Sequence, residues 1–208
     1  AQSVHGQEEI DAVVEVLKTS TQMGKNVSEM ENKIAKMFNK DFGLMTNSGT
    51  SSLMLAAEAA DLPKGSEVIT AAFTFSTTVT PILKNGLIPV FMDAELDTLN
   101  IDAKRLESFI TNKTSAIWIP NMLGNVPDWD IIQKVAKKHG LLVLEDSADT
   151  LGGTLRGTQT GCRSDISITS FYGSHIINCG GNGGWVGINN PKMARKARLL
   201  RSWGRTSS

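Results

Sequence analysis

The chain has 208 residues, of which 40% are hydrophobic, and its 21 Lys and Arg residues balance its 21 Asp and Glu residues. This length suits one domain, and the balanced charge provides no field that would attract nucleic acid or an anionic membrane surface. Cys162 and Cys179 are too few for a disulfide framework and lack the spacing of a metal site. We therefore expect a cytoplasmic protein without a bound metal.

Neither a membrane span nor a secretory signal is expected. The longest aliphatic runs, such as 141–144, are far too short to cross a bilayer, and no basic segment precedes an apolar one at the N-terminus. The sequence does not begin with Met and stops soon after an apparent helix. We expect the chain to be part of a longer protein.

Two helices are expected within residues 1–40. The first is indicated by apolar residues at helical spacing between Ile10 and Leu17. Ser28 and Glu31 form an S-x-x-E capping box, which predicts the start of the second helix.

Short apolar runs then alternate with helical patterns. The candidate strands are 67–70, 88–92, 115–119, 141–145, 165–169 and 185–188. The candidate helices are 51–60, 75–85, 103–110, 130–139 and 192–202. Continuous apolar runs are typical of strands covered on both faces, so the alternation predicts an α/β fold with a mostly parallel central sheet. Ligands of such sheets bind beyond the carboxyl ends of the strands.

The first candidate binding motif is the run Asn47-Ser48-Gly49-Thr50-Ser51-Ser52, which leads into a helical stretch. Small residues at a helix start expose backbone N–H groups in the positive potential of the helix dipole, and a phosphate fits there. Ordinary N-capping by Ser or Thr would require the same residue types.

The second is Glu145-Asp146, at the end of an apolar run. A carboxylate at this position is costly without a cationic partner, and the protonated ring nitrogen of a bound cofactor is one such partner. An acidic residue that merely caps a strand end is the alternative. Asp149, three residues later, could reach the same cavity.

The third joins Ser170-Phe171-Tyr172-Gly173-Ser174-His175 to a glycine cluster at 180–184. Glycines permit tight turns and a close approach of a ligand. The cluster precedes a strand rather than opening a helix, so it does not predict dinucleotide binding. His175 taken alone could equally be a structural or surface histidine.

The order of these motifs resembles the DegT/StrS-type sugar aminotransferase family over about residues 24–205. The resemblance implies the aspartate aminotransferase fold, fold type I of the pyridoxal-phosphate-dependent transferases, which is a three-layer α/β sandwich. Residues 1–208 would then be the large cofactor-binding domain, with the N-terminal helices 1–40 included and a C-terminal domain missing.

One branch of that family is more similar than the others, namely the 3-dehydrases of CDP- or GDP-linked 4-keto-6-deoxyhexoses. Three stretches carry this similarity. The first combines 75–79 with 85–91, the second is 123–125 followed by Asp128 and Asp130, and the third is 145–149. His175 aligns with the Schiff-base lysine of the aminotransferases, and the dehydrases also have histidine there. Gly173, Ser174 and Asn182 depart from the pattern of the branch.

Position by position, the resemblance implies the following roles. Gly49, Thr50 and Ser170 would hold the cofactor phosphate. Phe75 would stack on the pyridine ring, Asp146 would pair with its nitrogen, and Asp149 would lie near its hydroxyl. His175 would be the catalytic base.

Histidine cannot form the stable imine that lysine forms, and no lysine occurs between Lys138 and Lys192. We therefore expect pyridoxal phosphate or pyridoxamine phosphate to bind without a covalent link. The predicted function is a 3-dehydratase of a nucleotide-linked 4-keto-6-deoxysugar in deoxysugar or lipopolysaccharide biosynthesis, acting as a homodimer. Two alternatives stay open: a DegT-type aminotransferase, and an inactive partner subunit. Serine at the first cysteine position expected after Trp203-Gly204-Arg205 favours the type without an iron–sulfur cluster.

Overall fold

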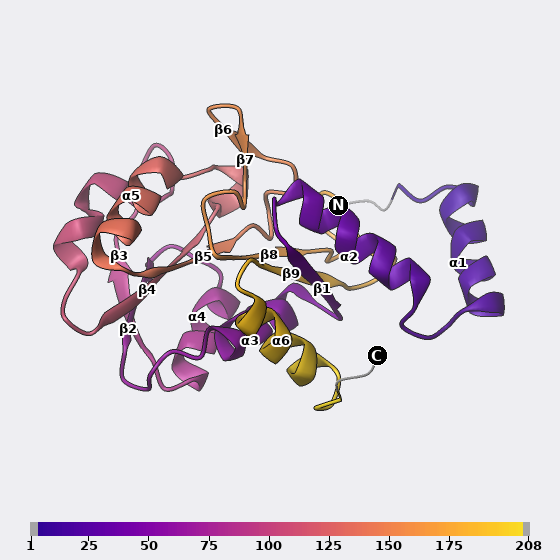
Figure 1. The fold of residues 1–208 in the computed structure, drawn as a ribbon. Coiled ribbons are helices and arrows are strands. Elements are labelled where there is room, and N and C mark those ends of the chain that lie inside the picture. The colour runs from indigo at the N-terminus through magenta and orange to yellow at the C-terminus, as the bar shows by residue number, and fades with distance from the viewer. Residues whose placement is uncertain (1–3, 206–208) are drawn as a thin grey trace.

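The computed structural model describes residues 4–205. The serine positions that bear on the iron–sulfur cluster lie outside this range. Within it, seven strands form a central sheet in the order β1-β9-β8-β5-β4-β2-β3 (Figure 1). The strands are β1 (Phe42–Thr46), β2 (Glu67–Ala71), β3 (Ile88–Met92), β4 (Thr114–Pro120), β5 (Leu142–Asp146), β8 (Ile166–Ser170) and β9 (Gly184–Ile188).

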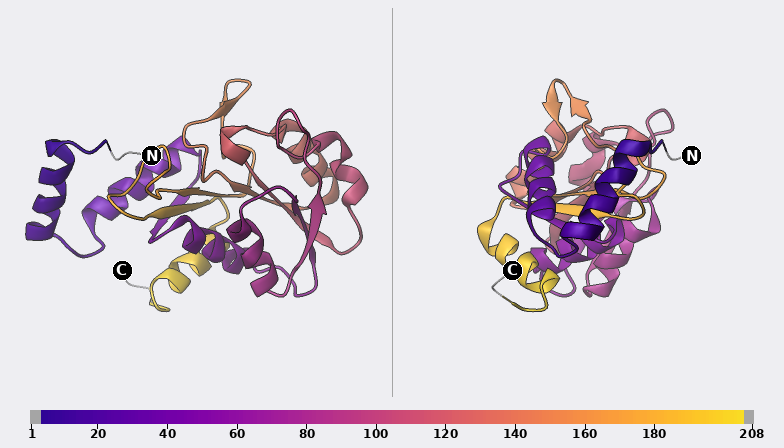
Figure 2. Two further views of the ribbon diagram at one scale, coloured as in Figure 1. Left: turned by 180° about the vertical axis from the view of Figure 1, so that it is seen from behind. Right: turned by 90° about the vertical axis from the view of Figure 1, so that its right-hand side faces the viewer.

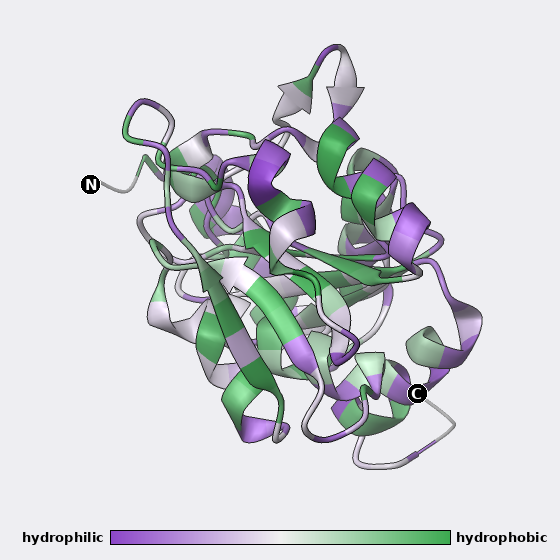
Figure 3. Cartoon of the chain, turned by 90° about the vertical axis from the view of Figure 1, so that its left-hand side faces the viewer, coloured by the Kyte–Doolittle hydropathy of each residue, from purple (hydrophilic) through white to green (hydrophobic). Residues whose placement is uncertain are grey.

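Most of this sheet is parallel. The five neighbouring strands β3, β2, β4, β5 and β8 pair in parallel. Strand β9 runs antiparallel to both of its neighbours, β8 and β1. The predicted mostly parallel α/β sheet is thereby confirmed. The strands lie at the centre of the molecule and are largely hydrophobic (Figure 3).

Helices cover both faces of the sheet and make it the middle of three layers (Figures 1 and 2). One face carries α3 (Gly49–Ala60), α4 (Ser76–Lys84) and α6 (Pro191–Arg201). The other carries α2 (Lys25–Met37), α5 (Trp129–His139) and the 3-10 helix η1 (Ala103–Phe109). Alternate residues of β4 serve the two layers: Trp118 packs on the α3 side and Ile117 on the α5 side.

Three smaller elements lie outside these layers. The 3-10 turn η2 (Met122–Gly124) follows β4, and the hairpin of β6 (Thr154–Leu155) and β7 (Thr158–Gln159) projects between β5 and β8. Helix α1 (Gln7–Thr19) stands apart from the body of the molecule, with no buried residue. Within residues 4–205, no helix combines the length and hydropathy needed to cross a bilayer.

The local expectations near the N-terminus need correction. The capping box predicted at Ser28 and Glu31 is wrong, because α2 begins at Lys25 with Gly24 as its N-cap. Glu31 instead accepts a hydrogen bond from the Met45 backbone N–H at 2.9 Å and pairs with Arg201. A tertiary partner thus outcompetes the local one.

Two further differences concern element type. Strand β1 was not predicted, because it is a short edge strand with only Leu44 fully buried and no apolar alternation. Residues 103–110 were expected to be α-helical, but 103–109 form the tighter 3-10 helix.

Candidate active site

A cavity of about 650 Å³ lies at the carboxyl ends of β4, β5 and β8, beside the N-termini of α3 and α4. All seven residues singled out from the sequence line it: Gly49, Thr50, Phe75, Asp146, Asp149, Ser170 and His175. They come from four separate segments. Parallel strands bring these segments together because their carboxyl ends share one edge of the sheet.

The N-terminus of α3 forms one wall. Ser48 is its N-cap, and the Ser48 side chain accepts a hydrogen bond from the Ser51 backbone N–H at 3.1 Å. A Cβ atom at Gly49 would lie only 2.7 Å from the Cβ of Ser170, so glycine lets the helix start reach the end of β8. The first N–H groups of α3, which have no intrahelical acceptors, therefore lie close to the Ser170 hydroxyl. Such a group of donors at a helix N-terminus has the chemistry that suits an anion.

Asp146 is the last residue of β5 and is only 5% exposed. Its carboxylate accepts hydrogen bonds from Thr78 Oγ1 at 2.7 Å and from the Ala148 backbone N–H at 3.1 Å. Burial raises the pKa of the Asp146 carboxyl above its ordinary value, and these two hydrogen bonds act in the opposite direction. Among the described residues, no Lys or Arg lines the cavity, so the carboxylate has no cationic side chain there as a partner.

His175 and Asp149 form a pair in the lining of the cavity. The Nδ1 atom of His175 lies 3.1 Å from Oδ1 of Asp149, and the histidine side chain is 19% exposed. The backbone N–H of His175 donates to the carbonyl of Tyr172, whose ring lies edge-on to the imidazole at 6.0 Å. This pairing was not predicted from the sequence. It occupies one ring nitrogen and leaves Nε2 for other contacts.

Phe75 is the N-cap residue of α4 and is 70% exposed at the rim of the cavity. Its neighbours include residues to which the sequence reasoning gave no role. Thr78, one helical turn later, holds Asp146, and Thr74 has a buried hydroxyl with no partner among the described residues. No local signal in the sequence pairs Thr78 with Asp146, because 68 positions separate them.

Glycines shape the segment after His175. The 179–183 loop folds back on the end of β8, where the Phe171 backbone N–H donates to Gly183 O at 2.9 Å. A Cβ atom at Gly184 would lie 2.2 Å from the carbonyl oxygen of Ser48. Gly184 therefore lets the first residue of β9 pack directly against the N-cap of α3.

Comparisons with known proteins agree with this geometry. The dTDP-4-dehydro-2,6-dideoxy-D-glucose 3-dehydratase of Saccharopolyspora spinosa is 40% identical over 88% of this chain and 41% of its own length. The aminotransferase from Psychrobacter cryohalolentis matches all of this chain and 53% of its own, with 30% identity and a TM-score of 0.94. The E. coli GDP-4-keto-6-deoxy-D-mannose-3-dehydratase with bound hydrated PLP matches 96% of this chain and 52% of its own, with 30% identity and a TM-score of 0.88.

The chain thus spans about half the length of these proteins. A family model described as the DegT/DnrJ/EryC1/StrS aminotransferase family matches residues 4–208. The family predicted from the order of the motifs is confirmed. Because this match covers nearly every residue, and because the motifs that suggested it meet in one cavity, the chain belongs to the DegT/DnrJ/EryC1/StrS aminotransferase family.

Proposed function

We propose that this chain is the cofactor-binding part of a nucleotide-sugar 3-dehydratase that uses pyridoxal phosphate or pyridoxamine phosphate. Its substrate would be a nucleotide-linked 4-keto-6-deoxyhexose, which loses its C3 hydroxyl as water. The observation that carries the proposal is that the His175–Asp149 pair lines the cavity, whereas no lysine of the described residues does so.

The residues of the cavity fit the proposed cofactor. Its ring nitrogen, when protonated, needs a buried anion, and Asp146 is a buried carboxyl without a cationic side chain beside it. Its phosphate needs N–H donors, which the start of α3 provides next to the hydroxyl of Ser170. When bound, the cofactor would supply an amine for the sugar ketone and a conjugated ring that accepts electrons.

Asp146 would hold a proton on the ring nitrogen. Thr78 and the Ala148 N–H fix the orientation of its carboxylate by one hydrogen bond to each oxygen. The anionic form is costly in this buried position without a cation, so the gain on pairing with a protonated ring is large. Phe75 would cover one face of that ring from the rim of the cavity.

His175 would take up one proton and return another, because an imidazole nitrogen can both accept and donate a proton. Asp149 would support it through Nδ1, so that Nε2 is the atom that exchanges the proton. A carboxylate on one ring nitrogen fixes both the tautomer and the ring orientation. An aminotransferase of this family would instead need an amine at this position to release its product.

The first experiment asks whether any lysine of the protein bonds to the cofactor. The protein is mixed with pyridoxal phosphate, reduced with borohydride and analysed by mass spectrometry. We expect no adduct on the wild-type chain, and an adduct at position 175 in His175→Lys. A reduced adduct on any wild-type lysine would refute non-covalent binding.

The second experiment concerns turnover. His175→Asn should bind pyridoxal phosphate as tightly as the wild type but lose about 100-fold or more in rate, since a general base is removed. His139→Asn is a matched control, because His139 lies on α5 and contacts Glu107 instead. A 3-deoxy product supports dehydration and an amino sugar supports the aminotransferase alternative. An inactive partner subunit would give no cofactor-dependent product.

A further inference from the structure

Glu145 precedes Asp146 on β5, and the two side chains point to opposite faces of the sheet. Leu144 and Asp146 lie on the α3 side, where Asp146 lines the cavity. Glu145 lies on the α5 side with Val143. Glu145 is only 1% exposed, and the proposed reaction gives it no role. A carboxylate so deeply buried requires strong compensation.

Four hydrogen bonds provide part of this compensation. Oε1 accepts from Asn121 Nδ2 at 2.9 Å and from the Ser147 hydroxyl at 2.7 Å. Oε2 accepts from the Gly161 backbone N–H at 2.8 Å and lies 3.2 Å from the Ser164 hydroxyl. Glu145 therefore joins three segments: the end of β4, the turn after β5, and the turn at 161–164.

Two of these segments contribute residues to the lining of the cavity. Asn121 lines the cavity, and its backbone N–H donates to the carbonyl of Asp146 at 2.8 Å. Ser147 lies between Asp146 and Asp149, and its carbonyl accepts from the Thr150 backbone N–H at 3.1 Å. The Glu145 contacts therefore reach the backbone on either side of both cavity carboxylates.

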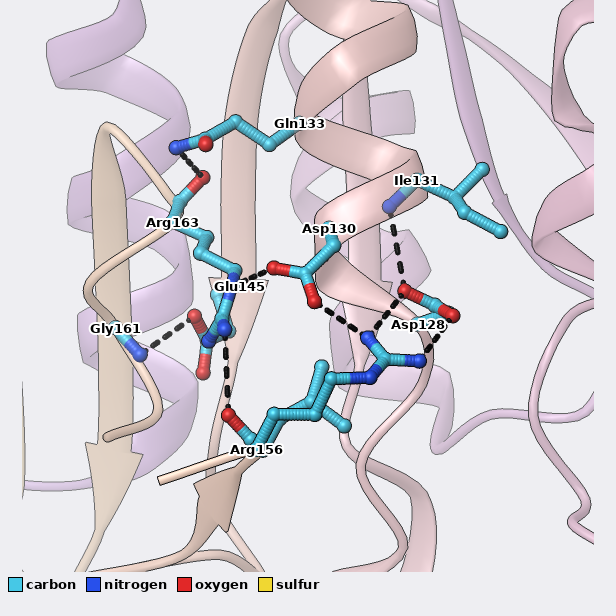
Figure 4. Close-up of polar contacts among 9 residues, drawn as sticks. Asp128, Asp130, Ile131, Gln133, Glu145, Arg156, Gly161 and Arg163 are labelled. Atoms are coloured by element: carbon cyan, nitrogen blue, oxygen red, sulfur yellow. Dashed lines mark hydrogen bonds and ion pairs between the residues drawn. The ribbon is translucent and has the colours of Figure 1, made fainter. Parts of the chain in front are cut away.

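The third segment is held firmly from outside. Figure 4 shows the Gly161 N–H directed at Glu145, Arg163 Nε paired with Asp130 at 2.6 Å, and Gln133 donating to the carbonyl of Arg163. In the same cluster, Arg156 of the hairpin bridges Asp128 and Asp130. The Arg163–Asp130 ion pair and the Gln133 hydrogen bond fasten the 161–164 turn to α5, so the turn offers Glu145 a fixed support. The Arg156 pairs fasten the hairpin to the start of the same helix.

Lys40 supplies the opposite charge. It is 6% exposed, and its ammonium donates to the carbonyls of Gly161 and Ser164. It also lies 3.3 Å from the Ser164 hydroxyl, which is within hydrogen-bond distance of Glu145 as well. The two charges therefore share one hydroxyl group.

We propose that Glu145 is a positioning residue, which places Asp146 and Asp149 for the cofactor by tying Asn121 and Ser147 to the rigid turn at 161–164. The proposal rests on the proposed function, since it presumes that pyridoxal phosphate binds in this cavity.

The test compares Glu145→Gln with the wild type by titration with pyridoxal phosphate. The variant keeps the side-chain shape but loses the charge and one acceptor oxygen. We expect the dissociation constant of pyridoxal phosphate to rise about tenfold. This is the loss expected if a displaced Asp146 no longer makes its charge-assisted hydrogen bond to the ring nitrogen. The pH at which the absorbance of the bound cofactor changes should fall, because a displaced Asp146 holds the ring proton less well. Glu107→Gln, an exposed carboxylate paired with Lys138, should change neither quantity.

Ser147→Ala separates the effect of the Glu145 hydrogen bonds from the effect of the Glu145 charge. It leaves the charge of Glu145 in place but removes one of its donors, so a smaller shift in the same direction supports positioning. It also serves as the measurement if Glu145→Gln fails to fold.

The outcomes distinguish the two proposals. If the wild type does not bind pyridoxal phosphate, both are wrong. If the wild type binds but Glu145→Gln and Ser147→Ala lower only the melting temperature, with dissociation constant and pH titration unchanged, Glu145 serves the fold alone. In that case only the positioning role is overturned.

Discussion

At the residue scale, the site depends on charged groups whose partners come from distant parts of the chain. Asp149 contacts His175 across 26 positions of the sequence, and Thr78 reaches Asp146 across 68. Neither contact has a local signature. Lys40 is a further example, because it is buried among the carbonyls of a turn more than 120 residues later.

Lys40 makes the stability of the fold depend on pH. Burial lowers its pKa from 10.5 to about 8, although nearby Glu145, Asp165, Cys162 and Asp41 act in the opposite direction. Below pH 8 the lysine is protonated in both states, and the cost of burying its charge is fully present. Between about pH 8 and 10.5 the folded protein releases this proton and the unfolded chain keeps it, so Lys40 destabilises the fold less as pH rises.

Urea unfolding of the wild type and Lys40→Met tests this dependence. Within that window, the free energy of unfolding of the wild type should gain about 1.4 kcal/mol per pH unit relative to the variant. Lys25→Met is the control, because Lys25 is 87% exposed and should show no such difference. Equal pH slopes for wild type and Lys40→Met would contradict the prediction.

At the element scale, every strand of the central sheet except β1 was predictable, as was the edge that the parallel strands share, because apolar runs and their alternation with helices are local properties. The cavity residues could be placed near one another for the same reason. The reason for a glycine, in contrast, is often a close contact with a residue that is distant in the sequence, and this contact is seen only in the folded structure. Gly184 was assigned to a cluster that permits tight turns and the close approach of a ligand, but it lies at the start of β9 against the N-cap of α3.

Gly184→Ala should disturb the N-terminus of α3. The added methyl group would lie 2.2 Å from Ser48 O and 2.6 Å from Ser52 Oγ, so either β9 or α3 must shift. We expect a loss of about 1–3 kcal/mol in the free energy of unfolding, the usual cost of overpacking. Chemical denaturation measures it. Gly173→Ala is the matched control in the same region, because no atom lies within 4 Å of its Cβ position, and its stability should be unchanged.

At the scale of the whole molecule, the cavity opens among exposed apolar side chains. Phe73, Phe75, Tyr172, Ile176 and Ile177 are between 45% and 70% exposed, and two of them line the cavity itself. Apolar groups gathered beside a site are typical of an interface. We propose that a second copy of the protein covers this rim.

Light scattering tests the homodimer. The wild type should have twice the mass of one chain, and Ile176→Lys should shift the equilibrium toward the monomer by placing a charge in the interface. Leu96→Lys changes an even more exposed apolar residue that does not line the cavity, and it should leave the mass unchanged. A well-folded wild type that scatters as a single chain would refute the proposal.

Glu145 and Asp146 point to opposite faces of the sheet, and this arrangement limits where the chain can tolerate insertions and deletions. Deleting or inserting one codon within 142–146 would reverse the faces, so that Glu145 entered the cavity and an apolar residue met the donors of Asn121 and Gly161. The turn between β6 and β7 has no such alternation to preserve, because it projects from the body of the molecule. Natural variation in length should therefore accumulate at the hairpin, while β5 keeps an unchanged number of residues between its apolar start and Asp146.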